Sequence, residues 1–283
     1  MPKIITFGEI MLRLSPHGYQ RLFQNDQMEA TFGGGEANVA VSLCNYGDEA
    51  VFVTKLPSNA IGQAAIDCLR SFGVDVSYIV RGGDRVGIYY LEKGASQRGS
   101  VCLYDRAHSS IQEAISKEFD WDTIMDGADW FHFTGITPAL GNNMLDACLK
   151  ACEAAHRAGA KVSCDINYRS KLWSRDEARD AMTRLCHHVD VYIGNEEDAK
   201  DVFGIIADDS DITMGKLSKD GLLPNWFNSL ALKRLHLLFA VLHRPATMNG
   251  PVSCLTVRGV ISLKSIICTL WIVWAAVILL RQA

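Results

Sequence analysis

Hydrophobic and polar positions along the first two-thirds of the chain follow two patterns in turn. Short runs rich in β-branched and aromatic residues predict strands, and between them apolar residues recur at helical spacing. The predicted strands span residues 3–12, 50–56, 128–135, 161–167 and 189–195. The predicted helices span residues 59–73, 142–159, 174–189 and 196–204. Strands that alternate with helices predict an α/β fold, with a doubly wound, mostly parallel sheet covered on both faces.

Local signals support several of these helix ends. Gly73 and Gly159 stand where two helices should end, and glycine is the usual residue there. Ser174 and Glu177 have the spacing of a capping box, which predicts a helix start. Residues 85–93 and 100–106 instead alternate like strands and lie close together, so they predict a two-stranded excursion, a small β lid spanning about residues 86–105.

Composition narrows the compartment and the partners. The nine cysteines include no C-x-x-C pair, and Cys148 and Cys152 lie one helical turn apart without further metal ligands nearby, which favours buried thiols in a reducing cytosol. His132, His187 and His188 also lack companion ligands and are interpreted as structural or surface residues. No apolar signal sequence follows Met1, so a cytoplasmic location is expected.

Charge divides the chain into two parts. All 32 acidic residues lie at or before Asp220, whereas residues 222–283 contain six Lys or Arg and no acidic residue. These basic residues are scattered rather than clustered, so a nucleic-acid partner is not expected. The abrupt change in composition needs its own explanation.

A glycine-rich loop precedes a helical run at Phe32–Gly47. Glycines let a backbone turn tightly and approach a ligand, and a helix start has free amide groups. No Gly-Lys-Ser/Thr follows, so this is not a Walker A loop. By itself the loop is equally consistent with a plain turn.

Polar residues gather where three strands are expected to end, which is where parallel sheets bind ligands. Arg106, two residues after Tyr104, has the donors to clamp a carboxylate, although a surface arginine is an open alternative. The run Asp165–Trp173 carries Asn167, Arg169 and Lys171. The run Gly194–Ala199 carries acids that suit Mg²⁺ through water, or that complement a helix dipole.

Together these motifs resemble the ribokinase-like PfkB carbohydrate kinases, most closely the 2-keto-3-deoxygluconate kinases among them. The specific parts are GGGEAN, YDRAHS, D-x-N-Y-R-x-x-L-W and GNEED, and the resemblance runs from about Lys3 to Gly221. It implies ATP-dependent phosphorylation of a sugar acid at its C6 hydroxyl, with ATP and Mg²⁺ as cofactors. It also implies subunits that pair through the lid strands, hence a homo-oligomer.

The same resemblance assigns roles to residues. It brings these residues to the substrate: Gly34, Gly35, Asn38, Tyr90, Tyr104, Arg106 and Arg169. It assigns Asn167 and Asn195 to the nucleotide. It assigns Glu197 and Asp198 to Mg²⁺, indirectly through water.

The catalytic motif of these kinases is missing from this chain. It reads D-x-x-G-[AG]-G-D and opens a helix whose N-terminus and glycines receive the phosphoryl group, while the last Asp takes a proton from the sugar hydroxyl. No such motif follows Gly221. We therefore expect a kinase domain over residues 1–221, a tail of uncertain structure over residues 222–283, and no catalytic residue in this chain.

Codons offer an explanation for the tail. Trp is always TGG, Ile begins with AT and Ala begins with GC. A reading register one nucleotide upstream therefore turns Trp271–Ile272 into GAT, which is Asp, and Trp274–Ala275 into GGC, which is Gly. The string V-D-R-V-G-G-G-D-S-F-A-A-G is among those allowed. The tail is thus interpreted as the C-terminal third of the kinase read out of frame, with the shift near Gly221–Leu223, which also explains its missing acids.

Three functional readings stay open. The first is a kinase with impaired or no activity, and the second is a non-catalytic remnant that still binds a sugar acid. The third is a tail-anchored membrane protein, because Ser265–Leu280 is an uncharged run of 16 residues. A bilayer span needs about 18–20 apolar residues, so a membrane partner is not expected.

Overall fold

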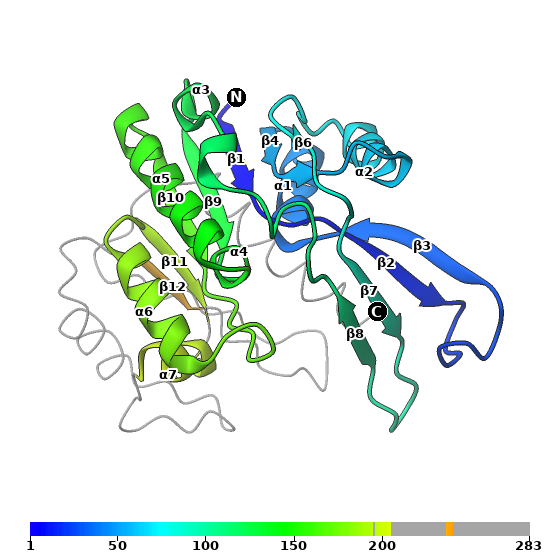
Figure 1. Cartoon of the computed structure of the whole chain (residues 1–283). Helices are drawn as coiled ribbons and strands as arrows, with labels where there is room; N and C mark the ends of the chain where they lie inside the picture. Colours follow the sequence, from blue (N-terminus) through cyan, green and yellow to red (C-terminus); the bar gives the residue numbers. More distant parts are fainter. Residues whose placement is uncertain (195, 205–235, 240–283) are drawn as a thin grey trace.

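The computed structural model describes residues 1–194, 196–204 and 236–239. Six parallel strands form the main sheet, in the order β12-β11-β10-β9-β1-β4 (Figure 1). Their bounds are β1 Lys3–Phe7, β4 Glu49–Val53, β9 Trp130–Thr134, β10 Lys161–Asp165, β11 Val191–Gly194 and β12 His236–Phe239. Since neighbouring strands are parallel, their carboxyl ends lie at one edge of the sheet. The predicted site residues of the loops after β10 and β11 come directly after two of these ends.

Helices cover both faces of this sheet, as the sequence predicted. One face carries α1 (Gly35–Asn45) and α2 (Ala60–Ser71). The other carries α3 (Trp121–Met125), α5 (Asn142–Ala158) and α6 (Arg175–Cys186), with α4 (Ile136–Ala139) and α7 (Glu196–Phe203) nearer the carboxyl edge. The doubly wound α/β fold is thereby confirmed.

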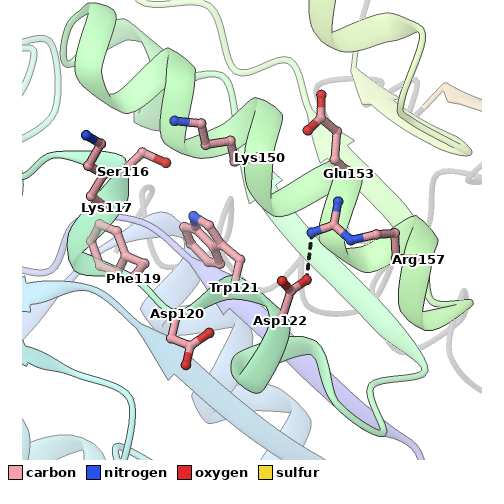
Figure 2. Close-up of a pocket in the computed structure, with 9 residues that line it drawn as sticks. All are labelled: Ser116, Lys117, Phe119, Asp120, Trp121, Asp122, Lys150, Glu153 and Arg157. Atoms are coloured by element: carbon pink, nitrogen blue, oxygen red, sulfur yellow. Dashed lines mark hydrogen bonds and ion pairs between the residues drawn. The ribbon is translucent and has the colours of Figure 1, made fainter.

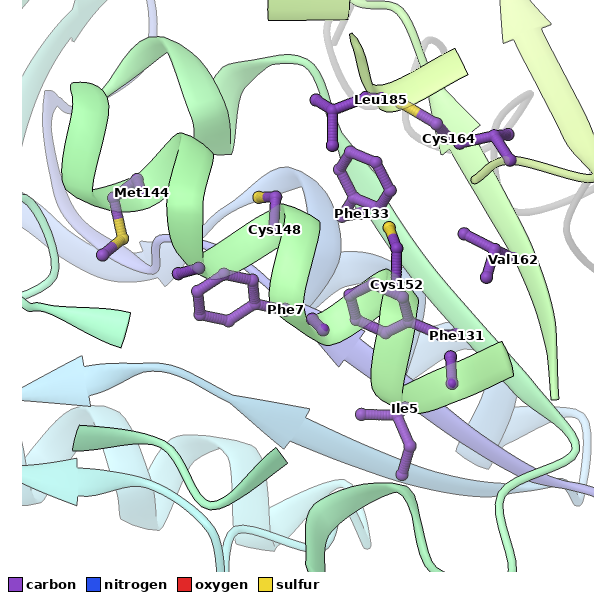
Figure 3. Close-up of a cluster of buried hydrophobic side chains, with 14 of the residues drawn as sticks. Ile5, Phe7, Phe131, Phe133, Met144, Cys148, Cys152, Val162, Cys164 and Leu185 are labelled. Carbon is purple, nitrogen blue, oxygen red and sulfur yellow. The ribbon is translucent and has the colours of Figure 1, made fainter. Parts of the chain in front are cut away.

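Alternation along the strands builds two cores. In β1, Ile5 and Phe7 point into the cluster under α5 and α6, whereas Ile4 points into the cluster under α1 and α2. Figure 3 shows Cys148 and Cys152 of α5 among the aromatic side chains of the first cluster. Both thiols are free and buried, as expected for structural cysteines.

The predicted helix-capping residues form the caps that the sequence indicated at α5 and α6. Ser174 Oγ accepts the Glu177 backbone N–H at 3.3 Å, and the Glu177 carboxylate accepts the Ser174 backbone N–H at 2.8 Å, which completes the capping box of α6. Gly159 ends α5 with φ of 81°, a left-handed conformation that favours glycine. Asn59 caps α2 by accepting the Gly62 N–H.

The lid is larger than the two predicted strands. It is a four-stranded sheet ordered β3-β2-β7-β8, and it projects away from the main sheet (Figure 1). Its strands are β2 Met11–Pro16, β3 Met28–Gly33, β7 Ile88–Glu92 and β8 Val101–Asp105. Two short strands, β5 Lys55–Leu56 and β6 Val80–Arg81, pair separately. The predicted excursion at 86–105 is therefore one half of the lid.

The predicted strand over residues 3–12 was wrong as one element. The chain leaves the main sheet after Phe7 and enters the lid as β2. The reason lies at Gly8, where a β-carbon would stand 2.2 Å from the carboxyl carbon of Glu36. The β-rich run over residues 3–12 conceals this break because only Gly8 and Glu9 interrupt it between Phe7 and Ile10.

Most of the predicted tail lies outside the described residues. The part that is described, β12, pairs in parallel with β11 at the edge of the main sheet. The tail boundary, the missing-motif region and the candidate anchor Ser265–Leu280 stay predictions. Among the described residues, no helix is both long and apolar enough to cross a bilayer.

Candidate active site

The glycine loop joins lid strand β3 to helix α1 at the carboxyl edge of the main sheet. A β-carbon at Gly34 would lie 2.0 Å from the Glu9 carbonyl oxygen, so no other residue fits there. Gly35 is less crowded, since its added β-carbon would lie 3.4 Å from Thr134 Cγ2. Asn38 lies one turn into α1, is half-buried, and donates its backbone N–H to Gly34 O at 2.9 Å. The three predicted residues of this loop are thus brought together.

Glu36 is a buried carboxyl in this loop that sequence reasoning missed. Its Oε1 accepts the Thr134 hydroxyl at 2.8 Å, the Thr134 backbone N–H at 3.1 Å and the Thr137 hydroxyl at 2.8 Å. Burial raises the pKa of the Glu36 carboxyl, against the effect of these hydrogen bonds. The side chain therefore fastens the start of α1 to the end of β9. An acid on the inward face of the helix right after three glycines was the available signal.

Arg106 is neither a surface arginine nor free to act alone. Its Nη2 donates to Oε2 of Glu9, and the two side chains are 11% and 2% exposed. Ser109 Oγ donates to the other Glu9 oxygen at 2.8 Å. Burial raises the pKa of Glu9, while Arg106 and Ser109 act in the opposite direction. The carboxylate that Arg106 clamps in this structure is the protein's own.

Cationic side chains from two separate elements lie near the ring of Tyr104 in β8, which is 47% exposed. Arg106 Cζ lies 5.4 Å from the centre of its ring, and Lys171 Nζ lies 5.9 Å away. Lys171, from the loop after β10, also donates to Cys102 O at 3.5 Å, which links that loop to the lid. Burial raises the pKa of the Tyr104 phenol, and the charges of Arg169 and Arg106 lower it. Arg106, Lys171 and Arg169 around Tyr104 are called the cation cluster below.

The lid register separates Tyr90 from Tyr104. Tyr89 pairs with Tyr104 and Tyr90 pairs with Leu103, so the two predicted tyrosines project from opposite faces of the lid. Tyr89 instead shares the face of Tyr104, and its hydroxyl would lie 3.5 Å from a β-carbon on Gly33. Strand alternation, counted from Tyr104 through the antiparallel pair, was the signal that could have favoured Tyr89.

The loop after β10 is joined to α7, the helix that follows β11. Asn167 adopts a left-handed conformation with φ of 41°, which Asn tolerates better than most residues. Directly after it, the Tyr168 backbone N–H donates to Asp198 Oδ1 at 3.1 Å. Asp198 therefore holds the loop that carries Arg169 and Lys171.

The predicted nucleotide and metal residues are placed only in part. Asn195 and the side chain of Glu197 lie outside the described residues. Over residues 1–194, 196–204 and 236–239, three or more His, Cys, Asp or Glu side chains nowhere gather as a metal site needs. Asp198 already spends one oxygen on Tyr168, so the described residues supply no more than part of a Mg²⁺ site. The Mg²⁺ assignment stays a prediction.

Of the structural and surface roles left open for His132, its burial supports the structural one. His132 is fully buried in β9, and its Nδ1 lies 2.9 Å from Ser163 Oγ, which also accepts the Trp130 indole N–H at 2.7 Å. Burial lowers the pKa of His132 to about 4, so the ring is neutral at physiological pH.

One cavity in the described part of the chain lies apart from all of these residues. It has a volume of about 270 Å³ and lies between α5 and the segment formed by α3 and the short helix η1 (Ser116–Glu118) (Figure 2). Arg157 pairs with Asp122 across it at 2.6 Å. Since α3 leads into the start of β9, this cavity lies away from the carboxyl edge and contains none of the predicted site residues.

Comparison with known proteins relates this chain to carbohydrate kinases. The pfkB family carbohydrate kinase profile matches residues 1–216. A 2-dehydro-3-deoxygalactonokinase from Haloferax volcanii is 37% identical over 207 residues, 73% of this chain and 64% of that protein. A 2-dehydro-3-deoxygluconokinase from Bacillus subtilis is 29% identical over 60% of this chain and 52% of its own length. The match thus spans less than two-thirds of either curated relative.

Solved structures agree with the fold. The crystal structure of 2-dehydro-3-deoxygluconokinase from Thermotoga maritima superposes with a TM-score of 0.77 and 46% sequence identity, covering 85% of this chain and 73% of that one. A PfkB carbohydrate kinase from Listeria grayi gives a TM-score of 0.75 at 31% identity, over 84% of this chain and 72% of that one. On the matched residues and the superposed fold, the chain belongs to the pfkB family of carbohydrate kinases.

Proposed function

We propose that this chain binds a 2-keto-3-deoxy sugar acid of the gluconate type, as a kinase whose phosphoryl-transfer step is impaired. One observation carries the binding half of this proposal, namely the cation cluster around Tyr104. Arginine and lysine donors from the lid and from the loop after β10 meet at one phenol ring. Guanidinium groups suit a carboxylate because their donors match its two oxygens. The relatives named above act on keto-deoxy sugar acids, which agrees with an acidic ligand.

The proposed roles follow from the position of each group. Arg106 and Arg169 receive the ligand's carboxylate, and Lys171 adds charge at the same end. The glycine loop brings backbone close to the sugar, since Gly34 leaves no room for a side chain. ATP supplies the phosphoryl group and Mg²⁺ offsets its charge when both are bound; Asn167, Asn195, Glu197 and Asp198 are proposed to hold them.

Impairment follows from the sequence after Gly221. The sequence after Gly221 contains no D-x-x-G-[AG]-G-D motif. It therefore lacks the Asp that would act as base and the glycines that would receive the phosphoryl group. A general base contributes about 10²–10⁴-fold, and each donor to developing negative charge about 10²–10³-fold. The residues proposed for the sugar acid, in contrast, all lie at or before Lys171. This division favours binding without turnover, which makes the sugar-acid-binding remnant the second candidate.

A titration and an activity assay separate the two halves of the proposal. The full chain titrated with 2-keto-3-deoxygluconate is expected to bind it more tightly than fructose, which has no carboxylate. Arg169→Gln should weaken binding of the acid about tenfold, from the loss of a charged hydrogen bond. Arg175→Gln, which removes an exposed arginine paired with Asp201, is the matched control. Equal affinity for acid and neutral sugar would remove the carboxylate assignment.

The activity assay addresses the tail. With ATP and the same sugar acid, the unaltered chain is expected to turn over at least about 10²-fold more slowly than the Thermotoga maritima enzyme. Restoring one nucleotide near codon 221 should recover turnover if the tail is out of frame. Ordinary turnover by the unaltered chain would contradict the proposed impairment.

The lid also supports a proposed homo-oligomer. Val101 and Leu103 are 42% and 53% exposed on the lid face that also carries Tyr90, opposite the face of Tyr104. A second copy covering this face would bury both side chains. Sedimentation of Leu103→Lys against the unaltered chain tests it, and identical sedimentation would count against the lid interface. A cytoplasmic location is proposed as well, and membrane fractionation distinguishes it from a tail anchor.

A further inference from the structure

The chain crosses between the main domain and the lid four times, and all four crossings meet at Glu9. Residues 8–10 lead from β1 into β2, and residues 33–35 lead from β3 into α1. Residues 86–87 enter β7, and residues 106–109 leave β8. A residue that touches every crossing is placed to fix the lid relative to the domain.

Glu9 fills the space at two of these crossings. A β-carbon at Gly34 would lie 2.0 Å from the Glu9 carbonyl oxygen, and one at Gly87 would lie 2.7 Å from Glu9 Oε1. Near the same point, the Leu12 N–H donates to Gly87 O at 2.9 Å, which ties β2 to the start of β7. Gly34 thus packs against the Glu9 backbone, and Gly87 packs against the Glu9 carboxylate itself.

At the fourth crossing Glu9 makes charged and neutral hydrogen bonds. It accepts from Arg106 Nη2 and, at 2.8 Å, from Ser109 Oγ. Within the described residues, Arg106 Nε finds no acceptor, so the guanidinium is held through its Nη2 by Glu9. A buried ion pair adds little net stability compared with apolar packing, whereas removing one partner is costly. The position of Glu9 at the four crossings therefore points to a role in orienting the lid.

We propose that Glu9 is a positioning residue that fixes the lid on the α/β domain and holds Arg106 against the Tyr104 ring. Lid orientation and the direction of the Arg106 donors are set by the same carboxylate. The part of this inference that concerns a ligand rests on the proposed function. The part that concerns the lid does not.

The test compares two changes at Glu9. Glu9→Asp keeps the charge but shortens the side chain, so it cannot reach both Arg106 and Ser109. Glu9→Gln keeps the length and can still accept from Arg106 while it donates to Ser109 Oγ. A geometric role predicts that the Asp variant is the more damaged, whereas a role through charge alone predicts the reverse. Glu118→Gln, which alters the 2.6 Å pair with Lys55 outside the four crossings, is the matched control.

Hydrogen–deuterium exchange of the unliganded full chain is the first readout. Glu9→Asp is expected to speed exchange of the β2, β7 and β8 amides about tenfold, with α5 and β9 unchanged. Glu9→Gln and Glu118→Gln should leave lid exchange within about twofold of the unaltered chain. Wild-type exchange in the lid of Glu9→Asp overturns the inference, whatever the ligand result. If that variant fails to fold, Arg106→Lys replaces it, with the same expected rise in lid exchange.

Calorimetric titration is the second readout. The ratio of the dissociation constants for 2-keto-3-deoxygluconate and fructose should shift about tenfold against the acid in Glu9→Asp, and far less in Glu9→Gln. An unchanged ratio in Glu9→Asp overturns the positioning of Arg106. If the unaltered chain binds no sugar acid, the proposed function fails, and lid exchange still decides the role of Glu9.

Discussion

The rings of Tyr89 and Tyr104 face one another across β7 and β8, with their centroids 6.0 Å apart. This pairing defines which lid face belongs to the cation cluster, because residues directly opposite in an antiparallel pair share a face. Tyr90 shares the other face with Leu103. The role that resemblance gave to Tyr90 thus depends on a side chain that projects away from Tyr104.

Replacing each tyrosine in turn tests this relationship. We expect Tyr89→Leu to weaken binding of the sugar acid about three- to tenfold, because it removes an aromatic neighbour of Tyr104 worth about 0.5–1.5 kcal/mol. Tyr90→Leu should change binding less than twofold and is the matched control. Calorimetric titration measures both. A larger loss in Tyr90→Leu would restore the assignment by resemblance and reject the one by register.

The lid also shows what a sequence can and cannot predict. Period-two alternation identified β7 and β8, because each is short and bounded by turn residues. It missed β3, whose residues Met28–Gly33 include polar side chains on an exposed strand, and it joined β1 to β2 across Gly8. Closeness in the sequence predicted that β7 and β8 pair, but local pattern does not show that β2 and β3 join them, so the four-stranded sheet could not be predicted from it.

The candidate site likewise contains residues that the sequence predicted and one that it did not. Arg169 and Lys171 follow β10, so the rule for the carboxyl ends of parallel strands selected them in advance. Arg106 instead follows β8 of the lid, which pairs antiparallel with β7, so that rule does not cover it. The partner of Arg106 was not predictable in this way. Glu9 lies 97 positions earlier in a run that reads as a strand, and only the fold brings the two side chains into contact. Sequence reasoning therefore found the cations and missed the carboxylate that holds one of them.

Changing Glu36 tests whether its hydrogen bonds to Thr134 and Thr137 stabilise the folded chain. Glu36→Ala would leave the backbone N–H and the hydroxyl of Thr134 without their acceptor, and Thr137 would keep only the Phe7 carbonyl at 3.4 Å; each unsatisfied group costs about 1–3 kcal/mol. We expect the free energy of unfolding to fall by about 3 kcal/mol or more. Glu36→Gln keeps an acceptor oxygen and should cost less than half as much. Urea denaturation followed by circular dichroism measures both, and equal losses would reject the hydrogen-bonding role.

Gly34 and Gly35 form a matched pair for the backbone of the same loop. Gly34 has φ of −169°, which any residue adopts, so the effect of Gly34→Ala is steric alone. Its β-carbon would meet the Glu9 carbonyl at 2.0 Å, whereas Gly35→Ala meets Thr134 Cγ2 at 3.4 Å. We expect a loss of about 2 kcal/mol or more for Gly34→Ala and less than about 1 kcal/mol for Gly35→Ala. Thermal unfolding checks this, and similar melting temperatures would show that the Glu9 backbone can move aside.

His132 predicts a pH dependence of stability whose sign follows from its environment. Burial holds its pKa at about 4 in the folded chain, below its ordinary value of 6.5. Between these values the unfolded chain binds more protons, so the free energy of unfolding rises with pH and is lost as pH falls from about 6.5 towards 4. The full contribution of this one group is roughly 3 kcal/mol.

A variant without the imidazole isolates that contribution from other groups. The buried carboxyls Glu9 and Glu36 have raised pKa values, so their effect runs in the opposite direction over the acidic range. Comparing His132→Gln with the unaltered chain cancels their share, since both chains retain them. The stability difference between the two chains should shrink as pH falls from 6.5 to 4, because only the unaltered chain loses stability through His132. Parallel stability curves for His132→Gln and the unaltered chain would mean that the buried ring does not resist protonation.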